Sequence, residues 1–111
     1  MTVVGPDMIL KTLYLAGPGS YSPAFGESAR KLRQAGFEVV DPAAASACRS
    51  YKDFIDRMLA SLSSGVGVAT MPGWQSSPES SLAVRYSRAL GNLDLSVTDW
   101  LRAARRWEEH R

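Results

Sequence analysis

The stretch "ILKTLYLAGPGSYSPAFGESARKLRQAGFEVVDP" (Ile9 to Pro42) decides the fold. Its first part is an apolar run that stops at Gly17-Pro18-Gly19, so residues 10–16 are predicted to form a buried strand. Residues 22–36 are predicted to form a helix, and residues 37–42 a second strand. A strand, a helix and a strand within about 30 residues form a parallel βαβ unit with a right-handed crossover.

Both ends of the predicted helix carry appropriate residues. Ser22 can cap its start, Pro23 suits the first helical position, and Gly36 suits the left-handed position behind its end. The side chains that would face the sheet recur at helical spacing and are Phe25, Ala29 and Leu32.

Downstream, the same alternation of helix and strand continues. A helix is predicted from residue 51, with an apolar stripe made by Tyr51, Phe54, Ile55, Met58, Leu59 and Leu62. Residues 66–71 are predicted to form a third strand, and Ser77 and Pro78 to begin a third helix. The residues expected to point inward from that helix are Leu82, Tyr86, Ala89 and Leu90.

The C-terminal part supplies one more strand and one more helix. The alternating "LDLSV" at residues 93–97 predicts a fourth strand at an edge of the sheet. Ser96 or Thr98 can cap a last helix, in which Trp100, Ala103, Ala104 and Trp107 share one face. We therefore expect an α/β protein with a parallel sheet between two layers of helices.

Composition narrows the possible classes of protein. We expect residues 1–8 to form a flexible N-terminal lead and residues 9–111 a single domain. One cysteine and one histidine exclude an internal disulfide and argue against a zinc site or a histidine-based catalytic triad. We expect no membrane span and a cytoplasmic protein, since the chain has no long apolar stretch and no signal-peptide pattern. Nucleic-acid binding is not expected, because acidic residues dilute the basic C-terminal segment.

Three loops are predicted to surround a ligand crevice. In open parallel sheets, ligands bind beyond the carboxyl ends of the strands. That rule brings together Gly17-Pro18-Gly19, Asp41-Pro42 and Pro72-Gly73-Trp74. Each loop also has a purely structural interpretation, since Gly-Pro and Pro-Gly sequences form turns wherever strands end.

Several segments, in this order, resemble the nucleoside 2-deoxyribosyltransferase superfamily: "LYLAGP", "PAF", "LRQAGFEVVDPA", "YKDFIDRMLASL", "MPGW" and "RALG". The branch that the chain resembles most closely contains small, phage-associated proteins of unknown function. The resemblance implies a flavodoxin-like (Rossmannoid) fold with four to five strands, and homodimers or higher assemblies. It also implies cleavage or transfer of the N-glycosidic bond of nucleosides or nucleoside monophosphates, without metal or cofactor.

The resemblance also implies where acidic residues should stand. The attacking glutamate of the family falls at Ala83, and a glycine of the same motif falls at Glu79. Two further acidic positions fall at Met58 and Val66. Glycosyl chemistry needs one carboxylate at the anomeric carbon and an acid for the leaving base, and alanine provides neither.

For the ligand itself, the resemblance and the loops suggest a set of contact residues, namely Tyr14, Gly17, Pro18, Asp41, Gly73, Trp74 and Ser77. Tyr14 matches an aromatic residue that lines the base pocket of the family, and it also suits a core position. Trp74 could stack on a base or pack against the protein. Asp41 could contact a ribose hydroxyl or only form a turn.

Three functions therefore remain open. The first is a nucleoside- or nucleotide-binding protein that has lost catalysis. The second is an active N-glycosidase or deoxyribosyltransferase in which Glu79, Asp41 or a partner-subunit residue replaces the missing acid. The third is an interaction module that uses exposed Trp74, Trp100 and Trp107 to assemble.

Overall fold

The structure is a computed structural model that describes residues 12–18, 23–40 and 50–109, with side chains described as far as residue 106. The predicted N-terminal lead, Ser22, Asp41, Pro42 and the side chain of Trp107 lie outside the described residues. Across the described part of the chain, no helix is long and apolar enough to cross a membrane.

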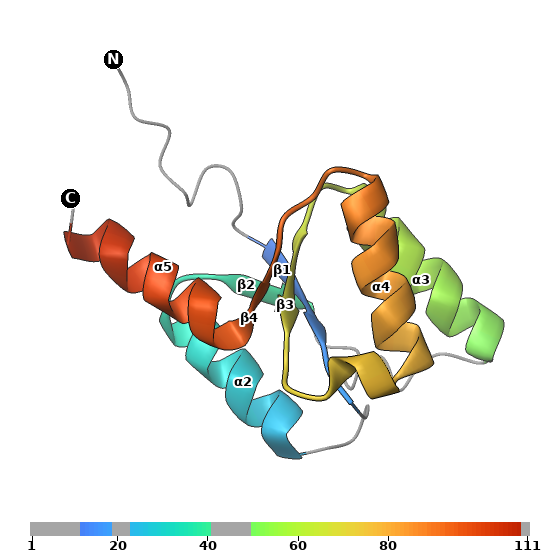
Figure 1. Cartoon of the computed structure of the whole chain (residues 1–111), viewed down its shortest axis with the longest axis horizontal. Coiled ribbons are helices and arrows are strands. Elements are labelled where there is room, and N and C mark those ends of the chain that lie inside the picture. Colours follow the sequence, from blue (N-terminus) through green and yellow to red (C-terminus); the bar gives the residue numbers. More distant parts are fainter. Residues whose placement is uncertain (1–11, 19–22, 41–49, 110–111) are drawn as a thin grey trace.

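Four parallel strands form the centre of the molecule (Figure 1). They are β1 (Thr12–Ala16), β2 (Glu38–Val40), β3 (Gly67–Thr70) and β4 (Asp94–Ser96), in the spatial order β2-β1-β3-β4. The register pairs Leu13 with Val39 and Tyr14 with Val68. This arrangement confirms the predicted α/β class and the edge position of the fourth strand, and it is consistent with a flavodoxin-like fold.

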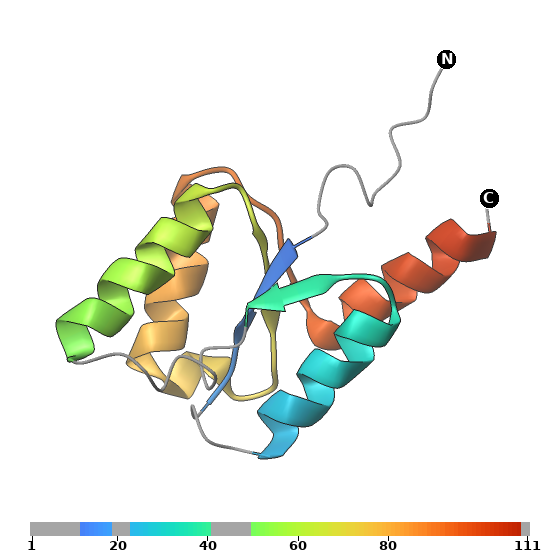
Figure 2. The same ribbon diagram turned by 180° about the vertical axis from the view of Figure 1, so that it is seen from behind.

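Helices cover both faces of the sheet. Figures 1 and 2 show α2 (Pro23–Gln34) and α5 (Val97–Glu109) on one face, and α3 (Tyr51–Ser63) and α4 (Pro78–Ala89) on the other. A short 3-10 helix, η2 (Trp74–Ser76), lies between β3 and α4. The predicted end of α2 is confirmed, because Gly36 has a φ of 105°.

The alternation of side chains along β1 divides the interior into two apolar clusters. Leu13 and Leu15 face α2 and α5, where they pack with Phe25, Leu32 and Trp100. The other face of the sheet packs against α3 and α4, in a cluster formed by Tyr14, Ala16, Met58, Leu62, Val66, Val68, Ala83 and Val84. We call this second group the α3/α4 cluster.

Trp100 joins α5 to the centre of the sheet. Its side chain has no exposed surface, and its indole N–H donates to the carbonyl oxygen of Val68 at 2.8 Å. Its ring also meets that of Phe37 edge to face, with centroids 5.7 Å apart. The expectation that Trp100 is exposed for assembly is therefore wrong.

The inward face of α4 differs from the predicted one. Leu82 and Leu90 are 39% and 46% exposed, and Ala89 is exposed as well. The face toward the sheet is instead made of small residues, which are Ser80, Ala83, Val84 and Ser87. The cause is close packing, since the Ser80 hydroxyl reaches the carbonyl oxygen of Gly17, and large side chains would hold the helix away. Tyr86 is half-buried, and its hydroxyl is hydrogen-bonded to that of Ser63.

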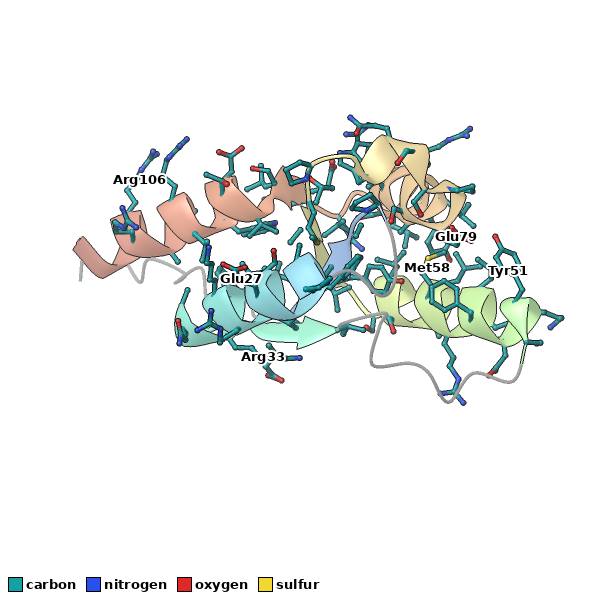
Figure 3. All side chains as sticks on the ribbon, turned by 90° about the horizontal axis from the view of Figure 1, so that it is seen from below. Glu27, Arg33, Tyr51, Met58, Glu79 and Arg106 are labelled. Atoms are coloured by element: carbon teal, nitrogen blue, oxygen red, sulfur yellow. The ribbon has the colours of Figure 1, made fainter. Side chains whose placement is uncertain are left out.

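The position of Tyr51 also differs from the prediction. The sequence pattern places it in the apolar stripe of α3, but it is 62% exposed. It is the first residue of α3, directly behind the cap Ser50, and it lies at the outer end of the helix (Figure 3). The buried residues of α3 begin further along, with Met58 and Leu62.

Candidate functional site

The order of the strands selects one place for a ligand. The chain leaves β1 toward α2 on one face, whereas β3 leads to α4 on the other face (Figure 1). The segments that follow β1 and β3 therefore separate at the point where the strand order reverses, which is where doubly wound sheets bind ligands. We call this the switch point.

Gly17 begins the loop after β1 and is buried. A Cβ atom on it would stand 2.8 Å from the sulfur of Met71 and 2.9 Å from Cζ of Phe25. Its carbonyl oxygen accepts a hydrogen bond of 2.6 Å from the hydroxyl of Ser80. Glycine is thus required here by close packing of β1, α2, β3 and α4, and protein side chains already fill the space beside its Cα atom.

The loop after β3 lies against the loop after β1. Gly73 has a φ of 86°, a left-handed conformation that favours glycine. A Cβ atom on it would be 3.4 Å from Cβ of Pro18, so the two loops touch across the switch point. The predicted convergence of Gly17, Pro18 and Gly73 is therefore observed, whereas Asp41 lies outside the described residues.

Trp74 begins η2 and is half-buried. Its side chain packs against the α3/α4 cluster, and its carbonyl oxygen accepts the N–H of Ser77 at 3.1 Å. Packing against the protein is thus one role of this residue, which as a whole is only partly buried.

Tyr14 also belongs to the α3/α4 cluster and is only 4% exposed. In the alternation of β1 it shares a face with Ala16, which ends the strand directly before Gly17. The core interpretation of Tyr14 thus has direct support from its burial.

The first turn of α4 carries the polar groups of the site. The hydroxyl of Ser77 accepts the backbone N–H of Ser80 at 3.2 Å, which confirms Ser77 as the helix cap. The same hydroxyl donates to Oε2 of Glu79 at 3.1 Å. Pro78 occupies the first helical position, as predicted. A carboxylate at this end of a helix is favoured by the helix dipole.

Met58, Val66 and Ala83 meet in one apolar environment. Their exposed fractions are 2%, 7% and 0%, and all three are members of the α3/α4 cluster. Figure 3 shows Glu79 of α4 and Met58 of α3 on the facing sides of their two helices. Glu79 precedes Ala83 by one helical turn, so the two residues share a side of α4.

Ser80 is the site residue that sequence reasoning missed. It is 8% exposed, and it connects the first turn of α4 to the end of β1 through its bond to Gly17. A signal was present, because Ser80 occupies the third helical position behind the cap and falls on the same side of the helix as Ala83 and Val84. Apolar periodicity does not reveal Ser80, because a search for apolar residues does not select a serine as part of a buried helix face.

The shifted pKa values belong to surface ion pairs outside this site. A hydrogen bond from Lys52 to Asp56 raises the lysine pKa, and a hydrogen bond to Asp94 raises the pKa of Arg88. Within the described ranges, no group of three or more His, Cys, Asp or Glu side chains could hold a metal ion.

Residues 11–95 match a family described as a domain of unknown function, DUF4406. Comparison with curated proteins and with solved structures gave no match. The matched span begins beside β1 and ends within β4, so it contains both switch-point loops and all of α4. Because the match covers more than half of the 111 residues, the chain belongs to the DUF4406 family.

Proposed function

We propose that this protein binds a nucleoside or nucleotide at the switch point and does not cleave its N-glycosidic bond. One observation carries the proposal: Met58, Val66 and Ala83, where the deoxyribosyltransferase resemblance implies acids, are buried together in the α3/α4 cluster. A retaining mechanism needs two carboxyl groups about 5 Å apart on either side of the scissile bond. The first turn of α4, behind the β3 loop, carries the carboxylate of Glu79.

Binding is supported by the architecture of the switch point. The loops after β1 and β3 touch at Pro18 and Gly73, and Trp74, the residue after Gly73, is only partly buried. An aromatic face next to a loop can stack on a base, because every nucleobase has a flat apolar face. No cofactor or metal is part of the proposal, and we place its action in the cytoplasm.

A binding panel tests the proposal. Purified protein is titrated by calorimetry with purine and pyrimidine ribonucleosides, their deoxy forms and their 5′-monophosphates. We expect at least one nucleoside to bind, and we expect Trp74→Ala to weaken that binding. Leu93→Ala is the control, since Leu93 is 48% exposed and follows α4 at the end opposite to the switch point. Lack of binding across the whole panel would contradict the proposal.

The alternative is an active enzyme in which Glu79 replaces the missing acid. It is favoured by the position of Glu79, one turn before Ala83 and on the side of α4 that faces α3. Release of free base from a nucleoside, abolished in Glu79→Gln, would establish this alternative. The preferred proposal predicts no release of base with either protein.

We also propose that the chain forms a homo-oligomer, a dimer or a higher assembly. Support comes from two exposed apolar side chains on α4, namely Leu82 and Leu90. Light scattering tests this part of the proposal, and a mass equal to one chain at high concentration would contradict it.

A further inference from the structure

Backbone N–H groups at the start of α4 donate hydrogen bonds to acceptors of the chain itself. Pro78 has no N–H, and the N–H of Ser77 donates to the carbonyl oxygen of Trp74. The N–H of Ser80 donates to the hydroxyl of Ser77. Free N–H groups at the start of a helix are what normally hold a phosphate. Here most of the N–H groups that could bind a phosphate are either absent or already hydrogen-bonded within the protein.

The start of α4 also carries a negative charge of its own, the carboxylate of Glu79. Glu79 is half-buried, and the Ser77 hydroxyl holds its carboxylate at 3.1 Å. The side chain projects between α4 and α3, on the side of α4 that also carries Ala83 (Figure 3). The carboxylate therefore supplies the anion that the helix dipole favours, and a phosphate at the same helix start would lie within a few ångströms of it.

We infer that Glu79 determines the specificity of the switch point and selects an uncharged nucleoside over its 5′-monophosphate. The inference rests on the proposed function and names the class of ligand for that site. A phosphate carries about 1.5 to 2 negative charges at neutral pH. At about 5 Å in a solvated setting, its repulsion by a carboxylate weakens binding on the order of tenfold, and salt reduces the effect.

Calorimetry with paired ligands tests this inference. The nucleoside that binds best is compared with its own 5′-monophosphate, on the wild-type protein, on Glu79→Gln and on the control Glu38→Gln. Glutamine keeps the size of the side chain and can accept the Ser77 hydrogen bond, but it has no charge. Glu38 is an exposed carboxylate at the first position of β2, so the control removes an equal charge at the amino edge of the sheet.

We expect wild-type protein to bind the nucleoside about tenfold more tightly than the monophosphate. Glu79→Gln is expected to narrow this ratio several-fold by tightening monophosphate binding, while Glu38→Gln keeps the wild-type ratio. Raising the salt concentration should narrow the wild-type ratio as well.

Two other results would overturn the inference while the proposed function stands. One is a monophosphate that binds wild-type protein as tightly as the nucleoside. The other is a wild-type preference that Glu79→Gln leaves unchanged. If neither ligand binds any of the three proteins, the proposed function itself is contradicted, and the inference falls with it.

Discussion

At the scale of single residues, the proposal of binding without cleavage depends on Ala83, where the deoxyribosyltransferase resemblance implies a glutamate. Its methyl group has no exposed surface and lies among Tyr14, Met58 and Val84. A carboxylate at this position would lose its hydration without gaining a partner among these side chains, which is one of the costliest substitutions in a protein. The position was predictable from the sequence motif, but its closed environment required the structure.

Ala83→Glu is therefore expected to lower the free energy of unfolding by about 3 kcal/mol or more at pH 7.5. Burial raises the folded-state pKa of the new carboxyl above its unfolded value of about 4.3. The ionisation penalty is complete above the raised pKa and fades as the pH falls toward about 4.3. Urea denaturation at pH 7.5 and pH 5 measures both effects, with Ala60→Glu at an exposed position of α3 as the control. Equal stability of Ala83→Glu and wild type at pH 7.5 would show that residue 83 reaches water.

Trp100→Phe tests the link between α5 and the sheet. Phenylalanine preserves much of the apolar volume but removes the N–H that donates to the Val68 carbonyl oxygen. Losing this hydrogen bond together with part of the buried indole volume is expected to cost about 1–3 kcal/mol of unfolding free energy. Chemical denaturation measures the loss, and the exposed Leu93→Ala should change stability by about 0.5 kcal/mol or less. A stability loss in Trp100→Phe no larger than in the control would contradict this account of Trp100.

At the scale of elements, the contact between β1, β3 and α2 depends on a missing Cβ atom. Gly17→Ala would place its methyl group 2.8 Å from the Met71 sulfur and is expected to destabilise the protein by about 1–3 kcal/mol. Gly26 offers a matched comparison, because it lies inside α2 and a methyl group on it would have nothing within 4 Å. Gly26→Ala is expected to stabilise the protein by about 0.5–1 kcal/mol. Thermal unfolding of both variants checks the pair, and shifts of the same sign would refute this explanation.

The helices also show which buried faces the apolar pattern of the sequence predicts correctly and which it does not. Phe25, Ala29 and Leu32 of α2 are buried as predicted, because large apolar residues at helical spacing determine which side of a helix packs. In α4 the same reasoning selected Leu82 and Leu90, which are exposed. Close approach to the sheet favours small residues there, and their low hydrophobicity hides the buried face from any search for apolar stripes.

At the scale of the whole molecule, sequence patterns predicted the class of the fold and the edge position of β4. The order β2-β1-β3-β4 depends on which strands pair, and pairing is a long-range property that local patterns do not specify. The switch point follows from that order, so only the structure could show that Pro18 and Gly73 touch there. The burial of Met58, Val66 and Ala83 in one cluster is likewise a property of the assembled layers.

Equilibrium dialysis followed by chromatography tests at once whether the switch point binds a nucleoside and whether it leaves the N-glycosidic bond intact. Wild-type protein on one side of the membrane is equilibrated with a nucleoside, and both compartments are then separated into intact nucleoside and free base. We expect an excess of intact nucleoside on the protein side, and no free base beyond a protein-free control. An even distribution of nucleoside, or free base that increases with protein concentration, would contradict the proposed function.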